Sequence, residues 1–104
     1  MVKEKKIKVG VIGSSGFVGE ELLLLISQHS QIDLCAISSR ELAGKDLTKV
    51  FPNLAGKFDL SFSHPEDDIF TNCEALFLAM PHGKSMTMVN KFVDQGIKVI
   101  DLSA

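Results

Sequence analysis

The apolar and polar positions of this chain follow a strand period in some stretches and a helical period in others. Ile7, Val9 and Val11 alternate with other residues in a β-branched stretch, which predicts a strand over residues 6–12. A wide apolar face containing Leu22 and Leu25 predicts a helix over 20–29. Because residues 32–37 again read as a strand, the first third of the chain is predicted to be one βαβ unit.

The same alternation of strands and helices continues to the end of the chain. The predicted elements are a short helical piece within a loop over 38–58, a strand over 58–62, a short helix beginning at 65, a buried strand within 74–80, a helix over 84–95 ended by Gly96, and a strand over 97–102. This order predicts a single α/β domain over 1–104. We expect a Rossmann-like, doubly wound and mostly parallel sheet with helices on both faces.

A glycine-rich turn joins the first predicted strand to the first predicted helix. Gly13, Gly16 and Gly19 form GxxGxxG, a spacing variant of the dinucleotide-binding fingerprint. N–H groups at the start of the helix would face a pyrophosphate, and Ser14 and Ser15 could add hydroxyl donors. The strand before the turn and the helix after it are the context that this motif requires. Gly10 is expected to pack closely within the strand, away from any ligand.

The second predicted strand ends at Ser38, Ser39 and Arg40. An NAD-binding domain usually carries an acidic residue here for the ribose 2′-hydroxyl, whereas hydroxyls and a guanidinium suit a 2′-phosphate. The three residues therefore favour NADP(H). The alternatives are a solvated arginine paired with Glu41, or Glu41 as the acidic residue of an NAD site.

The turn after the buried strand contains Met80, Pro81 and His82, and we expect it at the same edge of the sheet as the glycine turn. His82 has no partner in sequence that would make it a general acid or base. No histidine has the spacing of a metal site, so no metal is expected. Cys35 and Cys73 lack a CxxC spacing, and neither is expected to have a lowered thiol pKa or to act as a nucleophile.

Composition excludes several classes of partner. The 104 residues carry a net charge of −2 with lysines and glutamates mixed, which argues against nucleic acid. No apolar stretch has the length of a membrane span or the position of a secretory signal, so we expect a cytoplasmic protein with reduced cysteines.

Several motifs, taken in order, resemble the N-terminal region of the N-acetyl-γ-glutamyl-phosphate reductases. They are residues 9–22, Ser38-Ser39-Arg40 with 43–45, Phe51-Pro52, the Pro-His-Gly turn within 78–85, and 99–104, and they span nearly the whole chain. The family enzyme is a cytoplasmic oxidoreductase of arginine biosynthesis that reduces an acyl phosphate with NADPH through a cysteine thioester. The resemblance implies that cofactor contacts come from Gly13, Ser14, Ser15, Gly16, Phe17, Val18, Ser38, Ser39, Arg40, Met80, Pro81 and His82.

The family's cysteine motif and its substrate-binding residues lie beyond the matched region, so no catalytic residue is expected in this chain. We therefore expect an inactive N-terminal fragment that ends after an uncovered strand, with the small-molecule substrate site and homo-oligomer contacts in a missing domain. The alternatives are the cofactor domain of an aspartate-semialdehyde-dehydrogenase-like enzyme and a stand-alone nucleotide-sensing module.

Overall fold

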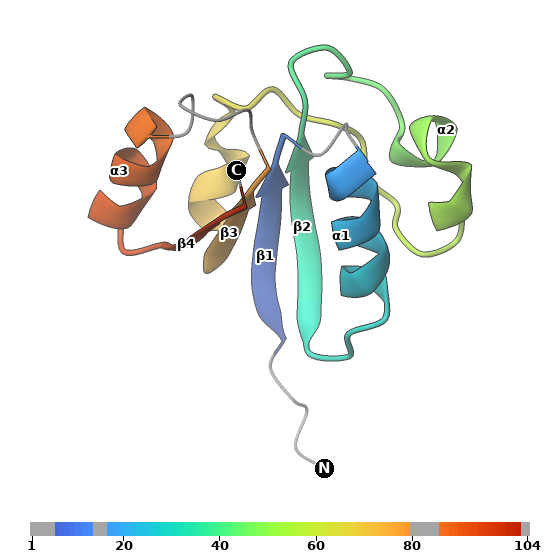
Figure 1. The fold of residues 1–104 in the computed structure, drawn as a ribbon, viewed down its shortest axis with the longest axis horizontal. Coiled ribbons are helices and arrows are strands. Elements are labelled where there is room, and N and C mark those ends of the chain that lie inside the picture. The colour runs from blue at the N-terminus through green and yellow to red at the C-terminus, as the bar shows by residue number, and fades with distance from the viewer. Residues whose placement is uncertain (1–5, 14–16, 80–85, 103–104) are drawn as a thin grey trace.

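The computed structural model describes residues 6–13, 17–79 and 86–102, and for residues 17 and 86–88 it describes the backbone alone. Strands from all of these ranges form one parallel sheet (Figure 1). Its members are β1 (Ile7–Ile12), β2 (Ile32–Ser38), β3 (Ala75–Leu78) and β4 (Lys98–Asp101), in the order β2-β1-β3-β4.

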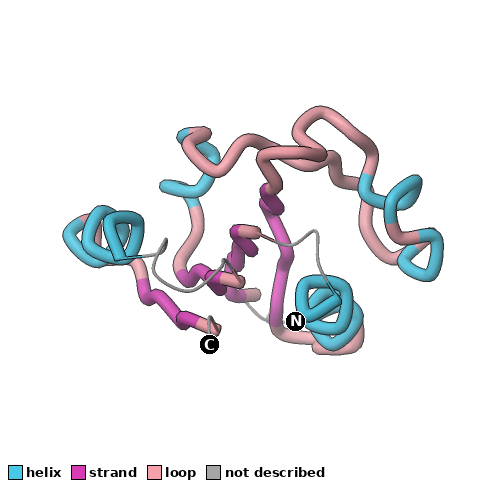
Figure 2. The backbone as a smooth tube through the Cα atoms, turned by 45° about the horizontal axis from the view of Figure 1, so that its top comes forward, coloured by secondary structure: helices cyan, strands magenta, loops and turns pink. Residues whose placement is uncertain are grey.

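Helices cover both faces of this sheet (Figure 2). They are α1 (Phe17–Ser27), α2 (Leu47–Val50) and α3 (Met86–Asp94), with the 3-10 helices η1 (Pro52–Leu54) and η2 (Asp68–Asn72). Side chains of α1, α2 and η1 pack on one face, and side chains of η2 and α3 pack on the other. The predicted α/β class, a Rossmann-like parallel sheet with helices on both faces, is confirmed.

The alternation of β1 divides the interior into two cores. Val9 and Val11 enter the first core with Leu23 and Ile26 of α1, while Ile12 enters the second. Each of these aliphatic side chains is at least 96% buried. Burial of one such side chain contributes about 1.5–3 kcal/mol, so the two cores hold the helices on the sheet.

A β-bulge interrupts the pairing of β1 with β2. Val9 pairs with Leu34 and Gly10 pairs with Ala36, so Cys35 has no pairing position on β1, although its thiol donates to the Val9 carbonyl at 3.5 Å. Cys35 and Ala36 consequently both pack against the second core, although they are consecutive residues. Past the bulge, Ile37 joins the first core and Ser38 stands opposite Ile12.

The predicted strand over 58–62 is wrong. Within the segment, Ser61 forms an isolated bridge with Asp46, and just after it Ser63 forms another with Ser38. Phe62 is buried and Leu60 is half-buried against the first core, while Asp59 and Ser61 face solvent. The alternating sequence correctly indicates which side chains are buried, but the segment that carries them is a loop packed against the first core and not a strand.

The other predicted elements are present with shifted ends. Helix α1 begins three residues before the predicted start at residue 20, so Gly19 lies inside its first turn. Gly96 follows α3 with a φ of +81°, which confirms the left-handed stop predicted there. The start of the predicted helix at residue 84 lies outside the described residues.

Candidate functional site

The strand order reverses at β1, which lies between β2 and β3. The chain passes from β1 to β2 on one side and then crosses to β3 on the other. In open α/β sheets, ligands bind beyond the carboxyl ends of the strands at such a reversal. The Ala79 N–H donates to the Ile12 carbonyl at 2.9 Å, so the ends of β1 and β3 meet at this edge.

Gly13 directly follows β1 at this edge. Its φ of +83° lies in the left-handed region, which glycine adopts without steric cost. Its N–H donates to the Ser38 carbonyl at 3.1 Å and to the Ser38 hydroxyl oxygen at 3.2 Å. This N–H is therefore already hydrogen-bonded to Ser38 of β2. The donors to a phosphate would have to be N–H groups of later residues.

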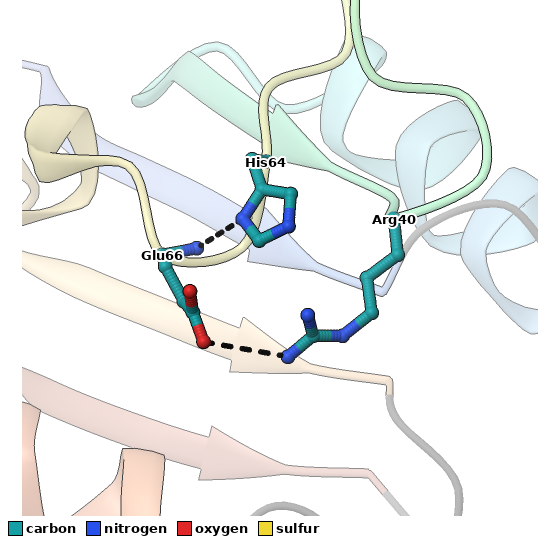
Figure 3. Close-up of polar contacts among 3 residues, drawn as sticks. All are labelled: Arg40, His64 and Glu66. Atoms are coloured by element: carbon teal, nitrogen blue, oxygen red, sulfur yellow. Dashed lines mark hydrogen bonds and ion pairs between the residues drawn. The ribbon is translucent and has the colours of Figure 1, made fainter.

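The three residues at the end of β2 have different environments. The side chains of Ser38 and Ser39 are buried, and the Ser39 hydroxyl oxygen accepts from the Leu42 N–H at 3.2 Å. Arg40 is exposed, and its guanidinium lies 3.7 Å from a carboxylate oxygen of Glu66 (Figure 3). The partner of Arg40 is thus Glu66 and not Glu41, the neighbour that the sequence suggested. Of the three residues, Arg40 is the one that offers charge to a ligand in solvent.

Helix α1 begins near the edge where β1 ends and runs back along the sheet (Figure 1), so its N-terminus lies at the same edge as Gly13. Gly19 is buried in the first turn and Val18 is exposed. The first N–H groups of a helix lack intrahelical partners and carry the positive end of its dipole. The remaining predicted site residues, Ser14, Ser15, Gly16, Met80, Pro81 and His82, lie outside the described residues.

Two cysteines meet over the middle of the sheet, which the sequence did not predict. Cys35 of β2 and Cys73, the residue after η2, place their sulfur atoms 3.1 Å apart. They reach each other across β1 at Gly10, where a Cβ would lie 2.9 Å from the Cys73 sulfur. The contact therefore depends on a glycine in the central strand.

This contact changes the acidity of both thiols. Donation from Cys73 stabilises a Cys35 thiolate and lowers the pKa of Cys35 to about 7, against the opposing effects of burial and of Asp33. The same bond, together with burial, raises the pKa of Cys73. The expectation that neither thiol has a lowered pKa is wrong for Cys35, because a neighbour 38 residues away supplies the hydrogen bond.

A groove of about 420 Å³ lies at the opposite edge of the sheet, between the end of α1 and the start of β2. Lys6, His29, Asp33 and Lys57 are among its lining residues. It is remote from the strand reversal, so it is not the cofactor site expected of this fold. Within the described ranges no group of three or more His, Cys, Asp or Glu could hold a metal ion, and no helix there could span a membrane.

Sequence reasoning also missed the turn that faces Arg40. His64 and Glu66 are 24 or more positions beyond Arg40, and no motif links them to it. The only signal was the Ser-His-Pro-Glu sequence of a turn, which does not say what the turn lies against. The bridge from Ser38 to Ser63 brings it there.

Comparisons with known proteins agree with this geometry. The family model described as "Semialdehyde dehydrogenase, NAD binding domain" matches residues 8–104. N-acetyl-γ-glutamyl-phosphate reductase from Saccharophagus degradans is 42% identical over 94% of this chain and 28% of its own length. The enzyme of the same name from Thiobacillus denitrificans is 44% identical over 94% of this chain and 29% of its own length. The chain thus spans less than a third of these curated relatives.

Solved structures share the fold. Aspartate semialdehyde dehydrogenase with NADP from Candida albicans aligns with a TM-score of 0.77 and 24% identity, over 93% of this chain and 29% of that one. Aspartate semialdehyde dehydrogenase II from Vibrio cholerae aligns with a TM-score of 0.79 and 17% identity, over 96% and 29%. At these identities the likeness concerns the fold alone. The family match over residues 8–104 decides the assignment, and the chain belongs to the family of semialdehyde dehydrogenase NAD-binding domains.

Proposed function

We propose that this chain is the NADP(H)-binding domain of an N-acetyl-γ-glutamyl-phosphate reductase. The observation that carries the proposal is the double hydrogen bond from the Gly13 N–H to Ser38. It ties the glycine turn after β1 to the Ser38–Arg40 segment after β2. The groups suited to a pyrophosphate and to a ribose 2′-phosphate therefore belong to one site, as a dinucleotide requires.

The residues present fit such a cofactor. The positive φ of Gly13 allows the sharp turn into α1, and the start of α1 offers N–H groups and a positive dipole end to the pyrophosphate. Arg40 lies exposed at the end of β2, where its guanidinium can grip a 2′-phosphate through two parallel hydrogen bonds. Ser38 and Ser39, being buried, act by fixing the two backbone segments. The nicotinamide, when bound, supplies the hydride.

The remaining parts of the proposal concern the whole enzyme. The substrate is a small acyl phosphate, and its site and the nucleophile lie outside this chain, as do the contacts of a homo-oligomer. The proposed location is the cytoplasm. Cys35 and Cys73 are assigned no catalytic role, because they face each other across β1 and not the edge that carries Gly13.

Binding measurements test the cofactor assignment. Isothermal titration calorimetry of this chain should give tighter binding for NADP(H) than for NAD(H). Arg40→Glu should weaken NADP(H) selectively, whereas Arg40→Lys, which keeps the charge and loses the fork, should fall between the two. Equal affinities for both cofactors in the unaltered chain would overturn the 2′-phosphate assignment. Acyl-phosphate reduction by this chain alone should be undetectable, and measurable turnover would place a nucleophile within it.

A second candidate is the cofactor domain of an aspartate semialdehyde dehydrogenase, which the shared fold favours. Complementation separates the two. The natural gene should restore growth without arginine to a strain that lacks N-acetyl-γ-glutamyl-phosphate reductase. Rescue of a strain that lacks aspartate semialdehyde dehydrogenase instead would favour the second candidate.

A further inference from the structure

The turn over residues 63–67 lies beside Arg40, although it is distant from Arg40 in sequence. Ser63 bridges Ser38 in parallel fashion at the outer side of β2. Its N–H donates to the Ile37 carbonyl at 2.8 Å, and its carbonyl accepts from the Ser39 N–H at 3.1 Å. The residues after Ser63 are therefore held next to the end of β2, where the adenosine ribose of a dinucleotide lies in this fold.

The turn has a fixed backbone and an exposed carboxylate. The Glu66 N–H donates to His64 Nδ1 at 3.2 Å, and the Asp67 N–H donates to the His64 carbonyl at 2.9 Å. Pro65 is buried, whereas the Glu66 side chain is 70% exposed. His64 is thus a positioning residue, and Figure 3 shows its ring between the backbone of Glu66 and the side chain of Arg40.

The ion pair between Arg40 and Glu66 is loose. Its 3.7 Å separation exceeds the 2.7–2.9 Å typical of a charge-assisted hydrogen bond, and both side chains are more than half exposed. Exposed pairs of this kind contribute little and yield readily to a stronger partner. A phosphate monoester carries about −1.5 to −2 charges at neutral pH and matches the guanidinium fork, so it would take Arg40 from Glu66.

From these contacts we propose that Glu66 sets the balance between the two cofactors, an inference that rests on the cofactor-binding function proposed above. With NADP(H), Glu66 loses Arg40 and its carboxylate stands near the 2′-phosphate, so Glu66 opposes binding. With NAD(H), Glu66 keeps Arg40 and its carboxylate can accept from the ribose 2′-hydroxyl. It therefore supplies, from a distant loop, the acidic group that the end of β2 lacks.

The test compares Glu66→Gln with Glu41→Gln by calorimetric titration of the 104-residue chain. Glu41 is the matched control, since it is an exposed carboxylate next to Arg40 in sequence. Four probes are used: NADP⁺, NAD⁺, adenosine 2′,5′-bisphosphate and AMP. Glu66→Gln should tighten NADP⁺ and the bisphosphate and weaken NAD⁺, changing the NADP⁺ to NAD⁺ affinity ratio by about 3- to 10-fold. Glu41→Gln should leave that ratio within about twofold of the original.

The outcomes separate this inference from the function on which it rests. If the unaltered chain binds NADP⁺ but Glu66→Gln leaves the affinity ratio unchanged, the role of Glu66 is wrong and the cofactor assignment stands. The same holds if Glu41→Gln shifts the ratio as much as Glu66→Gln does. If no dinucleotide binds the unaltered chain, both proposals fail. An unchanged urea midpoint for both variants verifies that the fold is intact.

Discussion

Replacing Gly10 by alanine should destabilise the domain, although alanine is ordinarily the better residue inside a strand. A Cβ at this position would lie 2.7 Å from Leu76 Cδ2, 2.9 Å from the Cys73 sulfur and 3.1 Å from Phe70 Cδ1. Leu76 and Phe70 are fully buried, and Cys73 is 4% exposed. Two of these distances are below 3.0 Å, so the added methyl group must shift buried side chains from their packed positions.

The expected cost follows from two opposing effects. Adding a carbon to a filled core costs about 1–3 kcal/mol. The smaller loss of backbone entropy for alanine returns about 0.5–1 kcal/mol. The two ranges leave a net loss of about 0–2.5 kcal/mol in the free energy of unfolding, and the close approaches of 2.7 and 2.9 Å favour about 1–2 kcal/mol. For a domain of this size it lowers the Tm by roughly 5–15 °C.

Urea denaturation followed by far-UV circular dichroism measures this loss, and a double-mutant cycle identifies its source. Leu76→Val shortens the nearest side chain, so the loss from Gly10→Ala should shrink by at least about 0.5 kcal/mol in that background. A Gly10→Ala variant as stable as the original chain would refute the packing argument. Full additivity with Leu76→Val would assign the cost to something other than this contact.

Three further predictions address the cap of η2, the Gly13 contact and the thiol pair. Asp67→Ala should lower the free energy of unfolding in urea by about 0.5–2 kcal/mol, because Asp67 accepts from the Ile69 N–H at 3.1 Å; Asp67→Asn, which still caps, should be nearly neutral. Ser38→Ala removes one acceptor of the Gly13 N–H and should cost about 0.5–1.5 kcal/mol, with NADP⁺ and NAD⁺ weakened alike in calorimetry; a selective loss of NADP⁺ would instead give Ser38 a phosphate contact. The lowered pKa of Cys35, about 7 against 9.0 for the ordinary thiol, should make stability rise between pH 7 and 9, where only the unfolded chain still binds that proton. Above pH 9 stability should fall, because the raised pKa of Cys73 keeps a proton on the folded chain that the unfolded chain has lost. Urea titrations from pH 6 to 10 should show this maximum, and its persistence in Cys73→Ala would disprove the thiol contact as its cause.

Local patterns predicted most of the sheet and its helices because each pattern reports burial of the residue itself. Val9 and Val11 alternate in sequence and in the structure, since both pack on one core. The same logic failed for 58–62, where Leu60 and Phe62 alternate on a loop. An alternation of two indicates only which side chains are buried. A strand also needs a neighbouring segment whose backbone N–H and C=O groups are free to pair with it.

The site could be predicted in part for a similar reason. Gly13 and Arg40 each follow a predicted strand, and parallel strands end at a common edge, so their proximity follows from the topology. Glu66 lies near Arg40 because an isolated bridge joins the segments that precede them. Cys35 contacts Cys73 across β1 at Gly10, which has no side chain. Both contacts join segments more than 20 residues apart, and no local periodicity records such contacts.

The bulge in β2 also decides where this strand tolerates a change in chain length. Leu34 pairs with Val9 and Ala36 with Gly10, so Cys35 occupies no position in the pairing of β2 with β1. Deletion of Cys35 would leave a regular strand in which Leu34, Ala36, Ile37 and Ser38 keep their faces. Deletion of Ile37 would instead move every later residue by one pairing position and carry Ser38 away from Gly13. Among homologous sequences, a strand one residue shorter is therefore expected to lack the counterpart of Cys35 and, with it, the thiol pair.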